Sequence, residues 1–340
     1  MNKSVRSCFL WLVYLGCLFL SCKGPAGKKS DDSEDLLQHP PYATLTDSIR
    51  QMPSGQAAEL YRRRGDLLAQ NNLHEIAVKD FKSAWELQPE EGTGLRYAST
   101  LSIIGRTGEA VKLLRDCLKR WPDNRNFSGL LGTIYQQSGK ANEALDLYTA
   151  LLATDSLNFD AWYEKGILLA KTKDTAAALS ALQRAYTLQP VNTYALELAH
   201  LYAENRNSKA LALCDEVLAK DSTKELVDPL FIKGIYYSNT SQYVKAIVQF
   251  DSCIRREYKF TDAWLEKGIA QFRQKNYEQA LATFRMTTTI SNTYPDGYFW
   301  VGRCYETTGK KEEALIYYQE ALALDKNFTE AKEAIKRLKA

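Results

Sequence analysis

The chain has 340 residues, of which 45% are apolar and 25% are charged. Its 44 basic and 41 acidic residues leave a formal charge of +3, which gives no reason to expect a nucleic acid as partner. The apolar content is sufficient for an extended core, and 9 prolines and 18 glycines are too few for a fibrous or wholly disordered chain.

Residues 1–21 predict a secretion signal. Lys3 and Arg6 precede an apolar run from Cys8 to Leu20, which is too short to cross a bilayer comfortably as a helix. A positive flank followed by a short apolar core is typical of segments that direct export.

The apolar run ends in Phe19-Leu20-Ser21-Cys22. This sequence resembles the lipobox of bacterial lipoproteins, although Phe19 stands where leucine is usual. The resemblance implies that Cys22 carries lipid and becomes the first residue of the mature protein, attached to a membrane. Cys17 as the anchor, and cleavage without lipid, remain alternatives.

Residues 22–52 predict a flexible tether with room for one short helix. Between Lys23 and Asp35 the chain has no apolar residue larger than alanine or proline, so it cannot bury enough surface to fold. By resemblance to bacterial lipoproteins, Lys23 after the anchor implies the outer membrane, on its periplasmic face. The acidic stretch 30–35 resembles export signals of some surface lipoproteins, so display on the cell surface is the alternative.

Residues 53–328 contain a repeat with a period near 34. Alanine recurs at Ala77, Ala110, Ala144, Ala178, Ala210, Ala246, Ala280 and Ala314. Twelve residues earlier there is usually a glycine, and four residues later a large apolar residue. Such self-similarity predicts stacked helical hairpins, in which glycine and alanine allow two helices to approach closely.

This pattern resembles the tetratricopeptide repeat (TPR) family, most clearly at Trp162, Gly166, Ala178 and Leu182. The resemblance implies an all-α fold: a right-handed α-α superhelical solenoid of about eight TPR helix hairpins plus a C-terminal capping helix. The repeats are expected at 58–90, 91–124, 125–158, 159–190, 191–226, 227–260, 261–294 and 295–328, and the cap at 329–340.

Local signals refine this expectation. Turn-forming pairs such as Asn71-Asn72, Thr107-Gly108 and Thr308-Gly309 are expected between paired helices. Asp160, Asp228, Asp262 and Asp296 precede first-helix aromatic residues or leucines and predict helix caps. The fifth repeat departs most from the pattern, which predicts an irregularity between Asn205 and Pro229.

No motif of catalysis is present, so we expect no enzyme, no cofactor and no small-molecule substrate. The sequence has no nucleophile elbow, zinc-protease motif or phosphate-binding loop. Seven cysteines and three histidines lack the spacing of metal ligands, so we expect no metal site.

The resemblance also implies that first helices line an inner groove that binds peptides. At the relevant places the chain carries apolar residues: Tyr163, Ile167, Tyr202, Phe231, Ile235, Leu265, Ile269, Phe272 and Phe299. An exposed apolar stripe predicts a partner surface. The alternatives are that these side chains form core between adjacent repeats, or are covered by the segment Leu36–Met52.

These observations favour a non-catalytic, lipid-anchored TPR scaffold that mediates protein–protein interaction in the bacterial cell envelope. Its partners would be other envelope proteins or peptides, bound on the concave face. The alternative function is a structural or assembly subunit of an outer-membrane secretion or motility machine.

Overall fold

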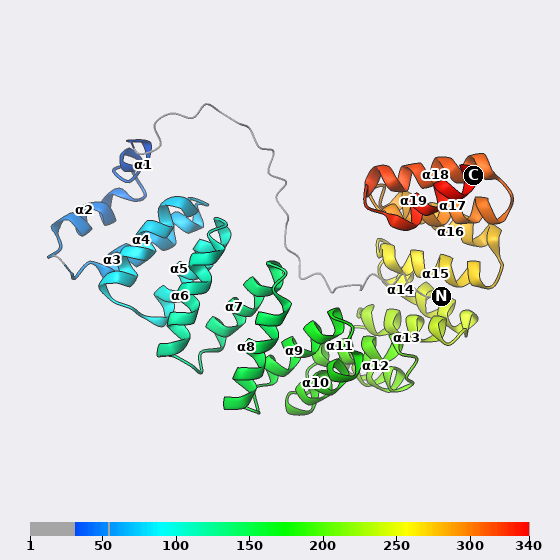
Figure 1. Cartoon of the computed structure of the whole chain (residues 1–340), viewed down its shortest axis with the longest axis horizontal. Coiled ribbons are helices and arrows are strands. Elements are labelled where there is room, and N and C mark those ends of the chain that lie inside the picture. The colour runs from blue at the N-terminus through cyan, green and yellow to red at the C-terminus, as the bar shows by residue number, and fades with distance from the viewer. Residues whose placement is uncertain (1–30, 54, 340) are drawn as a thin grey trace. The chain divides into compact units, whose positions relative to one another are not determined.

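The computed structural model describes residues 31–53 and 55–339, and every regular element in these residues is an α-helix (Figure 1). The expected all-α fold class is confirmed. The chain divides into two compact units, with the boundary between Pro122 and Asp123. The predicted signal peptide, Cys22 and the tether as far as residue 30 lie outside the described residues.

Unit 1 holds two helix pairs and two shorter helices before them. In chain order the helices are α1 (Asp31–Leu36), α2 (Ala43–Gln51), α3 (Ala58–Gln70), α4 (His74–Leu87), α5 (Glu91–Ile103) and α6 (Thr107–Arg120). The pairs are α3 with α4 and α5 with α6, and α4 packs on α5.

A buried ion pair fixes α2 to the first pair. Arg64 of α3 donates to both carboxylate oxygens of Asp80 of α4, each at 2.7 Å, and to Thr46 Oγ1 of α2 at 2.9 Å. Thr46 Oγ1 in turn donates to the Leu37 carbonyl at 2.7 Å. The segment Leu36–Met52, which was the alternative cover for the groove, packs on α3 within unit 1.

Unit 2 holds six further pairs and a terminal helix. They are α7 (Arg125–Gln137), α8 (Ala141–Thr154), α9 (Phe159–Lys171), α10 (Thr175–Leu188), α11 (Asn192–Glu204), α12 (Lys209–Lys220), α13 (Asp228–Asn239), α14 (Tyr243–Arg256), α15 (Thr261–Arg273), α16 (Tyr277–Ile290), α17 (Pro295–Thr307), α18 (Lys311–Leu324) and α19 (Thr329–Lys339). Together with unit 1, the described residues contain eight helix pairs, as the alanine period predicts.

The repeated glycine and alanine positions are where the two helices of a pair meet. All eight alanines of the period are fully buried. A Cβ added to Gly268 of α15 would lie 2.4 Å from Cε1 of Phe284 in α16, which is closer than real Cβ contacts allow. The glycine twelve residues before the alanine thus makes room for the large residue four after it.

Each turn inside a pair contains one residue with positive φ, which ends the first helix. The eight residues are Asn72, Gly105, Gly139, Lys173, Arg206, Ser241, Lys275 and Gly309. The expected turn at Thr107-Gly108 is wrong by two residues, because both belong to the first turn of α6 and Gly105 takes the left-handed conformation.

The predicted irregularity after the fifth pair is present. Residues 221–227 separate α12 from α13, a longer connection than those between the other pairs. Asp221 organises this loop by accepting hydrogen bonds from the Leu226 amide at 3.0 Å and from Thr223 Oγ1 at 2.9 Å. Arg256 of α14 adds an ion pair to Asp221 at 3.4 Å.

The helix α19 closes the C-terminal end of unit 2. Ala331 and Ala334 are buried against the last pair, and Arg337 forms an ion pair with Glu306 of α17 at 2.7 Å.

Within the part of the chain that the structure describes, no helix has the length and apolar character needed to span a membrane.

Candidate functional site

The first helices of the pairs form the inner side of unit 2. α11 contacts α13, α13 contacts α15 and α15 contacts α17, whereas successive second helices make fewer contacts with each other. At the start of this series, the Tyr163 ring of α9 stacks on Tyr194 of α11 with a centroid distance of 4.6 Å. We call this side of α9, α11, α13, α15 and α17 the inner face.

The nine residues predicted to form a partner groove all lie on these first helices, but six of them are core. Phe231 shows why: its ring packs against Phe250 and Phe260 at 5.7 and 5.0 Å. The alternative that these side chains form core therefore holds for the buried six, whereas partner binding on this face stays a prediction. The six, each 5–9% exposed, are Tyr202, Phe231, Ile235, Leu265, Ile269 and Phe299.

Three of the nine remain partly exposed on the inner face: Tyr163, Ile167 and Phe272. Phe272 lies with its ring edge-on to Trp300 of α17 at 5.4 Å and to Tyr277 of α16 at 5.1 Å. These side chains are held in place by neighbours and still present apolar surface to solvent.

Two carboxylates that the sequence did not single out are the most unusual groups on the inner face. Glu197 of α11 and Glu266 of α15 are only partly exposed, and neither has a hydrogen bond or ion pair to another described residue. Burial raises the pKa of Glu197 to about 7, and the charges of Asp228 and Glu204 add to the effect. Unpaired carboxylates in such surroundings are costly when ionised.

The same cause acts on Glu266. Burial raises its pKa to about 7, and Asp262 and Asp296 raise it further, while Arg273 lowers it without restoring the ordinary value. The side chain is therefore surrounded closely by protein but still reached by water.

Two more carboxylates on first helices of unit 2 have raised pKa values. Burial raises the pKa of Glu164 of α9 and of Asp228 of α13 above the ordinary range. Gln136 donates a hydrogen bond to Glu164 at 3.1 Å. We call Glu164, Glu197, Asp228 and Glu266 the acidic row.

The lysines of α13 and α15 do not neutralise the acidic row. Lys233 pairs with Asp215 of the preceding second helix α12 at 2.6 Å, and Lys267 pairs with Asp251 of α14 at 2.7 Å. Both lysines thus take their partners from second helices.

His200 is also on α11, and burial lowers its pKa, which favours the neutral form of the imidazole.

The first-turn aspartates differ from their expected role as caps. The side chains that cap first helices in unit 2 are Asn124 and Asn158. Asp160 instead accepts a hydrogen bond from Tyr194 of α11 at 2.8 Å, and Asp262 accepts one at 2.6 Å from Tyr294, which directly precedes α17. These aspartates therefore tie adjacent pairs together at the edge of the inner face.

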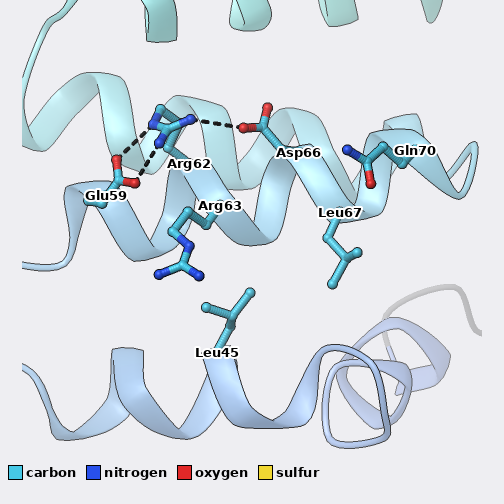
Figure 2. A pocket seen from close by; sticks show the side chains of 7 residues that line it. All are labelled: Leu45, Glu59, Arg62, Arg63, Asp66, Leu67 and Gln70. Carbon is cyan, nitrogen blue, oxygen red and sulfur yellow. Dashed lines mark hydrogen bonds and ion pairs between the residues drawn. The ribbon is translucent and has the colours of Figure 1, made fainter.

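Unit 1 carries the opposite charge at the equivalent position, two residues before the repeat glycine or its alanine replacement. Arg63 of α3 and Arg96 of α5 stand where unit 2 has Glu164, Glu197 and Glu266. Figure 2 shows Arg63 beside a pocket of about 380 Å³ between α2 and α3. The pocket lining also contains ion pairs of Arg62 with Glu59 and Asp66, and Arg96 joins Asp66 at 2.7 Å.

The cysteines of the described residues are buried and unreactive. Burial raises the pKa of Cys117 to about 11 and those of Cys214, Cys253 and Cys304 to about 12, so none is a ready thiolate. Among residues 31–53 and 55–339, no group of three or more histidine, cysteine or acidic side chains is placed to hold a metal ion.

Comparison with known proteins identifies repeats within unit 2. Family models described as tetratricopeptide repeat match residues 130–193, 233–295 and 295–328. A pre-mRNA-splicing factor 6 from Saccharomyces cerevisiae is 25% identical over 245 residues, which are 69% of this chain and 26% of that protein. The chain thus spans about a quarter of the length of this relative.

Solved structures share the fold. A tetratricopeptide repeat protein from Parabacteroides merdae is 20% identical with a TM-score of 0.63, covering 73% of this chain and 98% of that one. PilW, described as a type IV pilus biogenesis factor, is 16% identical with a TM-score of 0.54, covering 63% of this chain and 98% of that one. At these identities the likeness shows the fold alone.

Proposed function

Because this chain contains tetratricopeptide repeats, we propose that it is a non-catalytic scaffold that binds another protein on the inner face of unit 2. We further propose that lipid on Cys22 holds it in the bacterial cell envelope. The observation that carries the binding proposal is the pair Glu197 and Glu266, which are partly buried and unpaired within the described residues. Helix packing does not use their charges, so they are available to a partner.

The apolar part of the same face supports a protein as the partner. Tyr163, Ile167 and Phe272 remain partly exposed beside the acidic row. Aromatic side chains held by neighbours contribute most of the binding energy in many protein interfaces. A face that combines fixed aromatic residues with charges suits a peptide segment better than a small molecule.

The location is supported by sequence alone. A positive flank, a short apolar core and Ser21-Cys22 resemble a lipoprotein signal, and Lys23 after the anchor favours the outer membrane. In this proposal the solenoid stands on the periplasmic face, with display on the cell surface as the alternative.

Photocrosslinking in intact cells tests the binding proposal. A photoreactive phenylalanine analogue replaces Tyr163, His200 or Phe272 on the inner face, or Val248 or Ile316, which are 53 and 55% exposed on second helices. The proposal predicts a discrete crosslinked protein from the inner positions and little from the outer two. Crosslinks from the outer positions alone, or from none, contradict it.

An assembly subunit of an outer-membrane machine is the second proposal. The likeness to PilW, a pilus biogenesis factor, suggests this role but shows only a shared fold. Purification from envelope membranes separates the two proposals. A permanent complex of fixed stoichiometry supports an assembly subunit, whereas a dissociable partner at variable ratio supports a scaffold.

A further inference from the structure

The acidic row places carboxylates on four first helices of unit 2. Glu197 and Glu266 occupy the same place in their repeats, two residues before the small residue that contacts the second helix. Each is surrounded by protein and lacks a cation among the described residues at hydrogen-bond distance. A protein that keeps such groups without internal partners maintains an arrangement that an external cation would stabilise.

We propose that the inner face recognises a cationic segment of the partner protein, whose lysine or arginine side chains pair with Glu197 and Glu266. Asp228 lies on α13, between the helices that carry these two glutamates, and offers a further contact. Phe272 and Tyr163 receive the apolar side chains of the same segment. This inference rests on the proposed function and names the chemistry of its partner.

The spacing favours a segment of polypeptide over a single cation. Glu197 and Glu266 are on first helices two pairs apart, with α13 between them. Packed helices lie roughly 8–10 Å apart, so the two carboxylates are separated by more than one ion can bridge. An extended chain rises roughly 3.3 Å per residue and reaches both with about five residues between its cations.

The charges at other positions of the chain support recognition of a cationic segment by unit 2. The equivalent positions of unit 1 are Arg63 and Arg96, so an acidic row is not a general property of this repeat. Lys233 and Lys267 already pair with Asp215 and Asp251 of second helices, while Lys171 and Arg273 lower the pKa values of Glu197 and Glu266 by less than burial raises them. A nucleic acid, which carries one negative charge per phosphate, would be repelled there.

The test uses the full chain and three labelled peptides. Each has fourteen residues of serine and leucine, with lysine, glutamine or glutamate at every third position. Binding is measured by fluorescence anisotropy at physiological salt. The inference predicts that the lysine peptide binds about tenfold tighter than the glutamine peptide and that the glutamate peptide binds weakest.

A matched pair of variants separates local recognition from general charge attraction. Glu197→Gln with Glu266→Gln should weaken lysine-peptide binding about tenfold, because each charge-assisted contact is lost. Glu278→Gln with Glu320→Gln removes the same charge from exposed positions on the second helices α16 and α18, and should leave binding nearly unchanged. Equal weakening by both double variants, or equal binding of the lysine and glutamine peptides, overturns the inference.

Folding and the proposed function are checked separately. The melting temperature of the Glu197→Gln, Glu266→Gln variant should be no lower than that of the parent, because the two substitutions remove unpaired charges from partly buried positions. In cells, the crosslink from position 272 should be lost in this variant and kept in the control. A crosslink that persists in both variants refutes the cationic segment while the scaffold proposal stands; no crosslink even in the parent refutes the scaffold proposal.

Discussion

The charge of Asp228 on α13 acts on the carboxyl group of Glu197 on the neighbouring first helix α11. Burial is the main cause that raises the pKa of Glu197 to about 7, and Asp228 is the next. Two carboxylates that disfavour each other's ionisation, on adjacent helices, are a poor arrangement for stability alone. A cation supplied by a partner protein would relieve this repulsion.

The first prediction concerns stability and pH. The folded-state pKa of Glu197, about 7, exceeds its ordinary value of 4.5. The contribution of its protonated carboxyl to the free energy of unfolding is therefore fully present at low pH and is lost as pH rises from about 5 through 7. Glu197→Gln should therefore stabilise the protein above pH 7 by about 1–3 kcal/mol and have little effect near pH 4.5.

Thermal melts of the parent and the variant at both pH values check this prediction. The groups that face Glu197 are Asp228, Glu204 and Lys171, and they are unchanged in the variant. Glu278 is exposed on α16, so Glu278→Gln serves as the control and should change the melting temperature little at either pH. A Glu197→Gln protein that melts below the parent at pH 8 would show that Glu197 has a stabilising partner.

The second prediction concerns the contact between paired helices. Gly268→Ala places a Cβ 2.4 Å from the Phe284 ring, and the resulting overpacking should cost about 1–3 kcal/mol. Gly129→Ala on α7 meets nothing within 4 Å and should be neutral or slightly stabilising. Chemical denaturation gives the free energy of unfolding of each variant. An equal loss in Gly268→Ala and Gly129→Ala would show that contact with Phe284 does not determine the cost.

The third prediction concerns the attachment of α2. Asp80→Ala leaves Arg64 buried without its carboxylate partner, which should cost about 3–5 kcal/mol. Replacing both residues by apolar ones of similar size, as in Arg64→Met with Asp80→Leu, should cost much less. Melting temperature and protease cleavage near residue 53 are the measurements. If the double variant is as unstable as Asp80→Ala, the buried charge is not the cause.

The fourth prediction separates core from surface among the predicted groove residues. Phe231 is 5% exposed, so Phe231→Ala should destabilise by about 3–5 kcal/mol. Phe272 is partly exposed, so Phe272→Ala should cost less and act mainly on partner capture. Denaturation midpoints and crosslinking yields measure the two effects. Similar midpoints for both variants would place Phe231 outside the core.

The fifth prediction concerns the anchor. Cys22→Ala should release the protein from membranes or stop its processing, because several acyl chains hold a protein firmly while none does. Fractionation of cells and the mass of the mature N-terminus measure this. A variant that remains as membrane-bound and as fully processed as the parent would show that Cys22 is not the anchor, with Cys17 tested next.

The repeats could be predicted from sequence because their determinants are local and periodic. The eight alanines lie at the contact between helices, where any larger side chain would collide. The turns at Ser241 and Lys275 were harder to predict, since these residues adopt positive φ without being glycine or asparagine. There the closure of the helix pair, rather than residue preference, imposes the conformation.

The candidate site could be predicted only in part. Apolar residues on first helices are equally suited to a groove or to the core, and burial depends on the neighbouring pair: Phe231 is covered by Phe260 from beyond the end of α14. The glutamates resemble ordinary exposed helix residues until the adjacent helices are in place. Their one sequence signal is position, since Glu164, Glu197 and Glu266 stand at the same place in three repeats.

Binding of a partner on the inner face is tested most directly by comparing crosslinking from position 272 with crosslinking from position 248 in intact cells. Phe272 lies on the inner face and Val248 is exposed on the second helix α14. If the inner face binds the partner, one discrete envelope protein is captured from position 272 and not from position 248. Capture of the same protein from position 248 alone would contradict it.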